Sequence, residues 1–147
     1  MKKLFIAAAI IIATGFSTQL AAATEQHLPA DIQQSFAKNH PQIELQSWEE
    51  NEAFYTLHFI QDDKYWKEFY TLEGEKIGWS RNIGAFELPA VLFESIQTNY
   101  PDYWITDLFV IHLNHENTYY LTLENADEKI VLKNEDNSWS AYKSIMK

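Results

Sequence analysis

Two similar fourteen-residue segments occur in this sequence and limit the folds that the chain can adopt. The first copy, LPADIQQSFAKNHP, begins at Leu28, and the second, LPAVLFESIQTNYP, begins 60 positions later at Leu88. In both copies an apolar residue recurs at every fourth position. This spacing predicts a short amphipathic helix with one face to bury.

Proline marks both ends of each predicted helix. Pro29 and Pro89 suit a first helical turn, where the missing N–H group loses no partner. Pro41 and Pro101 push the residue before them out of the helical conformation. We expect the asparagine two residues before each closing proline to end the helix in the left-handed conformation.

A pattern of alternating apolar and polar residues follows each of these segments. Tyr119, Leu121 and Leu123 share one side of an extended chain, and the segment FYTLHF in the first half has the same period. Turn-forming residues separate such segments. The sequence therefore predicts eight strands, at residues 43–50, 53–60, 64–72, 76–81, 104–113, 118–124, 129–133 and 139–144.

A helix followed by four antiparallel strands thus occurs twice, which predicts an α+β fold of two tandem helix-plus-meander repeats. A repeat of this size cannot easily bury its helix alone. We therefore expect the two halves to share one sheet and one core, with both helices on one side. The predicted repeats are residues 24–86 and 87–147, which form one joint domain.

Residues 1–23 have the pattern of a secretory signal peptide. Lys2 and Lys3 precede an apolar run at positions 4–13, and three alanines at 21–23 provide a cleavage site. The run is shorter than the roughly 20 residues of a spanning helix, so we expect no stable membrane insertion after cleavage. With no cysteine, the chain lacks the lipid-attachment residue of a lipoprotein. These features predict a periplasmic or secreted protein of a Gram-negative type bacterium.

The charge argues against nucleic acid as a partner. The chain has 21 acidic and 11 basic residues, for a formal charge of −10, which becomes −12 when Lys2 and Lys3 leave with the signal. Such a charge repels phosphate backbones.

Patterns that indicate catalysis are absent from the sequence. There is no cysteine, no glycine-rich phosphate loop and no recognisable serine nucleophile motif, so we predict neither an enzyme nor a cofactor. His112, His115 and Glu116 have chemistry suited to zinc, but positions i and i+3 of a strand face opposite sides. We predict no metal site. A metal-binding envelope protein is the alternative, as is a structural or stress component without a specific ligand.

Aromatic residues indicate a binding surface. The segment KYWKEFYTL has aromatic residues on both faces, although a sheet with helices on one side needs one apolar face. The surplus predicts contact with a protein or peptide, although the same rings could fill a thin core. The predicted contact residues are Phe54, His58, Tyr65, Lys67 and Phe69, with the hairpin residues Asp62, Asp63 and Lys64 at the rim.

Three features together resemble a known family: the motif LPxxxxxxFxxxxP, the segment WEENEAFY at 48–55, and the doubled unit behind a signal peptide. They resemble the exported PepSY-like proteins with a β-lactamase-inhibitory-protein-like (BLIP-like) fold. The resemblance covers residues 28–142. It implies a curved sheet with helices on the convex side, a concave side open to a partner, and a role as inhibitor or regulator of an envelope or extracellular protein. No inhibitor-specific loop is present, so inhibition of β-lactamase is not predicted.

Overall fold

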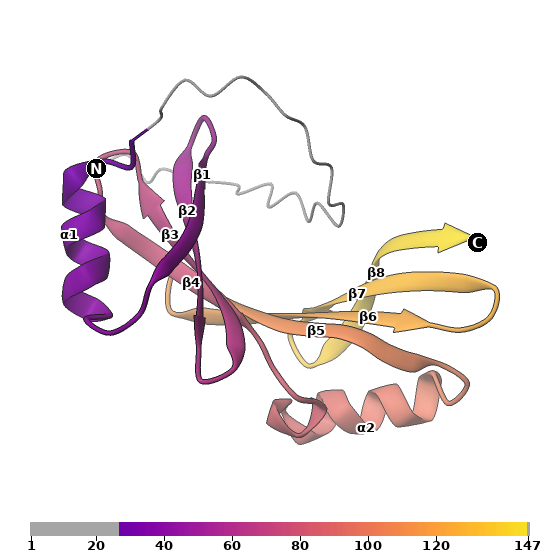
Figure 1. The fold of residues 1–147 in the computed structure, drawn as a ribbon. Coiled ribbons are helices and arrows are strands. Elements are labelled where there is room, and N and C mark those ends of the chain that lie inside the picture. Colours follow the sequence, from indigo (N-terminus) through magenta and orange to yellow (C-terminus); the bar gives the residue numbers. More distant parts are fainter. Residues whose placement is uncertain (1–26, 147) are drawn as a thin grey trace.

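The structure is a computed structural model that describes residues 27–146. The predicted signal peptide lies outside the described residues. Two helices and eight strands form an α+β fold (Figure 1), with a short 3-10 helix, η1 (Ala85–Glu87), before the second helix. In chain order the other elements are α1 (Ala30–Asn39), β1 (Leu45–Glu50), β2 (Phe54–Gln61), β3 (Lys64–Thr71), β4 (Lys76–Asn82), α2 (Ala90–Asn99), β5 (Trp104–Leu113), β6 (Glu116–Glu124), β7 (Glu128–Glu135) and β8 (Ser138–Met146).

Both helices begin directly after a proline, as the sequence predicted. Their ends differ from the prediction, because Asn39 and Asn99 do not adopt the left-handed conformation. Instead the following residues, His40 and Tyr100, leave the helix with φ of −131° and −133°. The proline that comes next disfavours the helical conformation at these positions, which accounts for the end of each helix.

Tight turns make three strands longer than the sequence predicted. Asn114 and His115 have φ of 52° and 68°, so a two-residue turn joins β5 to β6 and lets β6 begin at Glu116. Asp136, with φ of 54°, lies in the turn between β7 and β8. Left-handed residues at two-residue hairpins match the right-handed twist of the strands.

All eight strands belong to one antiparallel sheet in the order β1 to β8. Leu57 lies opposite Glu68, Glu68 opposite Trp79, and Trp79 opposite His112, so these side chains share one side of the sheet. This side carries both helices, as the sequence predicted. Figure 1 shows α1 and α2 on the outer side of the bend between the two halves.

The expected shared core is wrong, because the buried side chains form two clusters. The first lies under α1 and contains Leu28, Ile32, Phe36, Tyr55, Leu57, Phe59 and Tyr70. The second lies under α2 and contains Leu88, Ile96, Leu108, Leu121, Leu123 and Leu132. Eight strands span roughly 34 Å, whereas a helix is about 10 Å wide. Each helix therefore covers only part of the sheet.

A row of aromatic rings runs from the first cluster to β5 on the same side of the sheet. Neighbouring ring centroids lie 5.1 Å apart for Phe36 and Phe59, and 6.2 Å for Phe59 and Trp66. The separations are 5.4 Å for Trp66 and Trp79, and 5.2 Å for Trp79 and His112. This row occupies the helix side at the junction of the two halves.

A buried carboxylate holds the end of α1 against the sheet. Glu68 is 2 % exposed and accepts hydrogen bonds from Tyr70 Oη at 2.8 Å and from the Lys76 ammonium. His40 Nε2 lies 2.9 Å from the same carboxylate. Burial alone would raise the pKa of Glu68, but the hydrogen bonds from Lys76, His40 and Tyr70 outweigh it and hold that pKa below its usual range.

We expect the two clusters to respond independently to mutation. Leu57→Ala in the first should lower the free energy of unfolding by about 3 kcal/mol, and Ile96→Val in the second by about 1 kcal/mol. Their double variant should lose the sum to within about 0.5 kcal/mol, as measured by urea unfolding.

The matched control combines Leu57→Ala with Ile32→Val inside the first cluster, where the two losses should depart from additivity. Equal coupling in both double variants would contradict the division of the core.

Candidate functional site

The candidate site is the side of the sheet without a helix, which we call the open face. Alternation along the paired strands defines most of its residues. Asp107 and Tyr142 lie at irregularities of the register, and their contacts with Asn82 and Tyr120 place them on the same side. The open face includes Phe54, His58, Tyr65, Lys67, Phe69, Ser80, Asp107, Phe109, Tyr120 and Tyr142.

The structure brings together the five strand residues predicted as contacts. His58 lies opposite Lys67 on the neighbouring strand, and Tyr65 lies two residues before Lys67 on the same face. The rings of Phe54 and Phe69 meet edge to face with centroids 5.9 Å apart. Their role in binding stays a prediction.

Phe69 differs from the others in exposure. Its side chain is 4 % exposed, whereas Tyr65 is 40 % exposed. The Phe54 ring packs edge-on against Phe69, which helps to remove it from solvent. Phe69 therefore packs within the open face, where a partner cannot reach its ring.

The hairpin residues divide between the two sides of the sheet. Asp62 and Asp63 are exposed at the two-residue turn between β2 and β3, with φ of 52° and 57°. Lys64 instead lies on the helix side, in phase with Trp66, and its ammonium is 2.7 Å from the Glu87 carboxylate. The predicted place of Lys64 at the rim of the open face is wrong, because the turn contains only the two aspartates and strand alternation begins at Lys64.

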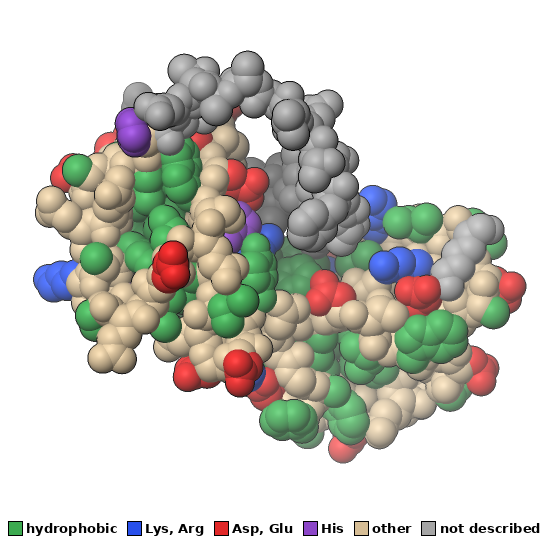
Figure 2. Space-filling model, viewed as in Figure 1, with side chains coloured by type: hydrophobic (Ala, Val, Ile, Leu, Met, Phe, Trp, Pro, Cys, Tyr) green, Lys and Arg blue, Asp and Glu red, His purple; other side chains and the backbone are tan. Residues whose placement is uncertain are grey.

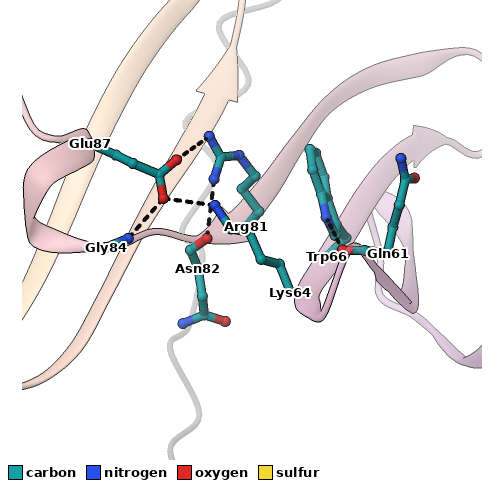
Figure 3. Close-up of polar contacts among 7 residues, drawn as sticks. All are labelled: Gln61, Lys64, Trp66, Arg81, Asn82, Gly84 and Glu87. Atoms are coloured by element: carbon teal, nitrogen blue, oxygen red, sulfur yellow. Dashed lines mark hydrogen bonds and ion pairs between the residues drawn. The ribbon is translucent and has the colours of Figure 1, made fainter.

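Glu87 gathers three donors into an arrangement that we call the Glu87 clasp (Figure 3). Its carboxylate accepts hydrogen bonds from Lys64 Nζ at 2.7 Å and from the Gly84 backbone N–H at 2.9 Å, and pairs with Arg81 Nη2 at 2.9 Å. Hydrogen bonds from Lys64, Gly84 and Arg81, in that order, lower the pKa of Glu87 to about 2. The clasp fixes the β2–β3 hairpin and β4 to the segment that leads into α2.

His58 links two polar side chains on the open face. Its Nε2 lies 3.2 Å from the Glu49 carboxylate on β1, and its Nδ1 lies 2.5 Å from the Tyr65 hydroxyl on β3. Burial and the nearby Lys67 ammonium lower the pKa of His58, against the opposing effect of Glu49. Burial, followed by the Glu49 charge, raises the pKa of Tyr65.

A second aromatic group, which the sequence pattern did not single out, lies on the open face. Phe109 and Tyr120 stack with ring centroids 5.2 Å apart and an interplanar angle of 7°. Tyr142 meets Tyr120 edge to face at 5.6 Å. A signal was present, because Phe109 and Tyr120 alternate with the buried Leu108 and Leu121, but it becomes informative only when the strand partners are known.

A groove of mixed polar and apolar lining lies beside α1, away from the open face. Its lining includes Leu28, Phe36, Ile43, Leu45 and Trp48. Figure 2 shows hydrophobic side chains along the seam between α1 and the neighbouring strands. The groove continues the first buried cluster to the surface.

The histidines proposed as the alternative metal centre do not converge. His112 lies on the helix side, where it stacks on Trp79 and its Nδ1 is 2.7 Å from Asn117 Oδ1. His115 is exposed in the following turn. Across residues 27–146, no three histidine or carboxylate side chains gather in a way that could hold a metal ion. Within the same range, no helix is long and apolar enough to cross a membrane.

Comparison with known proteins identifies the fold. No protein-family model matches the chain, and no curated protein matches it. Similar solved structures include a DUF2874 family protein from Bacteroides uniformis, with a TM-score of 0.68 at 13% identity, over 82% of this chain and 90% of that one. A protein from Bacteroides eggerthii, named as periplasmic, has a TM-score of 0.70 at 13% identity, over 82% and 90%.

A BLIP-like protein from Bacteroides fragilis has a TM-score of 0.61 at 15% identity, over 82% of this chain and 88% of that one. At such low identity the likeness concerns the fold alone. The chain therefore has a BLIP-like α+β fold, as the sequence resemblance implied.

The exposures of Tyr65 and Phe69 predict different losses of stability when each side chain is truncated. Phe69→Ala should lower the free energy of unfolding by about 3 kcal/mol, because it removes a buried ring. Tyr65→Ala should cost about 1 kcal/mol, since a half-exposed ring and one hydrogen bond are lost. Urea unfolding measures both, and equal losses would contradict the different burial of the two side chains.

The Glu87 clasp predicts a pH-dependent stability. A carboxyl whose pKa is depressed in the fold stabilises it above the unfolded pKa and loses this effect as the pH falls. Glu87→Gln should therefore be less stable than the wild type at pH 7, and the difference should shrink between pH 4.5 and about 2. Urea unfolding at several pH values measures the difference.

Glu94→Gln, at an exposed position on α2, is the matched control and should keep the pH dependence of the wild type. A constant deficit of Glu87→Gln at all pH values would rule out a charged clasp.

Proposed function

We propose that this chain is an exported, non-catalytic protein that binds a protein or peptide through the open face of its sheet. One observation carries the proposal: both helices lie on one side, and the other side has aromatic side chains in both halves. Aromatic residues set among polar ones dominate the energetics of protein interfaces. Strands hold such side chains more firmly than loops do.

Export is supported by the signal-like pattern of residues 1–23 and by the similar Bacteroides eggerthii protein, whose name refers to the periplasm. The BLIP-like fold supports the more specific proposal of an inhibitor or regulator of an envelope or extracellular protein. No observation of the described residues favours the metal-binding alternative.

We also propose that the chain consists of two PepSY-like repeats, at residues 24–86 and 87–147. The helix-plus-four-strand order occurs twice, and the two copies of the LP motif lie 60 positions apart.

Site-specific photo-crosslinking in the native envelope tests the binding function. A photoreactive phenylalanine analogue at Ile60, which lies opposite Tyr65, or at Tyr142 should trap the same partner protein from the open face, because both positions are 48 % exposed. The analogue at Val91, which is 48 % exposed on α2, is the matched control and should trap nothing specific.

Capture of the same protein from Val91 would place the contact elsewhere. Absence of any specific product from both open-face positions would overturn the binding function.

A further inference from the structure

The contacts of His58 fix the direction of two hydrogen bonds. A carboxylate can only accept, so the Glu49 contact at 3.2 Å requires the proton of His58 on Nε2. In a neutral imidazole the other nitrogen, Nδ1, is then an acceptor. The Tyr65 hydroxyl, 2.5 Å from Nδ1, must donate to it.

The environment favours the protonation states that this direction needs. Burial and Lys67 lower the pKa of His58, so its ring is neutral at neutral pH. Burial and Glu49 raise the pKa of Tyr65, so its hydroxyl keeps the proton that it donates. Glu49, His58 and Tyr65 thus form an ordered chain of donors and acceptors, which we call the relay.

We propose that the relay makes the Tyr65 hydroxyl oxygen a hydrogen-bond acceptor for the partner, and that the partner group it takes is an uncharged donor such as a backbone amide or a hydroxyl. This inference rests on the proposed binding function. The single proton of Tyr65 is committed to His58, so only the lone pairs of its oxygen are free. The Tyr65 side chain is 40 % exposed, so a partner can reach it.

Lys67 selects against a cationic donor. Its ammonium lies 5.9 Å from the centroid of the Tyr65 ring, on the same face. An arginine or lysine of the partner would bring a like charge close to Lys67, and like charges across an interface oppose binding. An uncharged donor has no such penalty.

Acidification reverses the relay. A protonated His58 carries protons on both nitrogens, so Nδ1 donates to the Tyr65 oxygen and the hydroxyl proton turns outward. The charged and titratable groups that face His58 are Glu49 from β1 and Tyr65 and Lys67 from β3. The partner's donor then meets a donor, and binding weakens.

Nitrogen-15 NMR of the exported protein tests the relay without any partner. At pH 7.5 His58 should be the neutral tautomer with its proton on Nε2, and the Tyr65 hydroxyl proton should couple to Nδ1. Glu49→Gln should mix the two tautomers, because an amide can donate as well as accept. His40, held by Glu68 on the helix side, is the internal control and should not change. A proton on Nδ1 or a charged His58 at pH 7.5 would overturn the inference.

Two small probes separate the donor classes. At equal concentration, N-methylacetamide should shift the NMR signals of Tyr65 in the wild type more than methylguanidinium does. Lys67→Gln should reduce this difference between the two probes. A stronger response to methylguanidinium would overturn the selection of an uncharged donor.

The last test measures how tightly the protein captured from the open face binds. Its affinity for the wild type should fall as the pH drops through the lowered pKa of His58, whereas Tyr65→Phe should bind about tenfold more weakly at pH 7.5 and change little with pH. If a partner is captured but His58 has its proton on Nδ1, this inference is overturned and the binding function stands. The same holds if the wild type and Tyr65→Phe lose affinity equally as the pH falls. The correct tautomer with no captured protein overturns the binding function and, with it, the role given to Tyr65 in recognition.

Discussion

The pairing of β4 with β5 decides which side of the sheet each helix occupies. Trp79 lies opposite His112 and Arg81 opposite Val110, so the alternation of side chains continues in phase from the first half into the second. A slip of one residue would turn every side chain of the second half over and move α2 to the side opposite α1. The open face exists because this register leaves one complete side of eight strands without a helix.

Three sets of contacts bear on this register. The aromatic row from Phe59 to His112 crosses β4 and β5 on the helix side. The Glu87 clasp fixes the chain where it leaves β4 for α2, which directs the connection that returns as β5. On the open face, Asn82 donates to Asp107 at 2.9 Å, which ties β4 to β5 there. Backbone pairing, ring stacking and ion pairs thus agree on one alignment of the halves.

Local rules of the sequence predicted most of the fold but only part of the site. The prolines that flank each helix and the alternation of side chains along each strand depend on neighbours in the chain, so the helices and strands could be placed. Alternation alone grouped Phe54, His58 and Tyr65 on one face. The burial of Phe69 and the turn of Lys64 toward Glu87 depend on packing and on the length of a hairpin. The contact between Glu49 and His58 depends on a register shift between β1 and β2 that no local pattern reveals.

The aromatic row gives the molecule an optical property of its own. Trp66 and Trp79 lie with ring centroids 5.4 Å apart and planes inclined by 48°. Indole transitions at this separation couple strongly, and the sign and size of the resulting circular-dichroism couplet depend on the angle between them. Since one ring belongs to β3 and the other to β4, the couplet reports the local twist of the sheet. Any change in the twist of β3 against β4 would therefore be visible without a label, as a change in the ultraviolet circular dichroism of two native side chains.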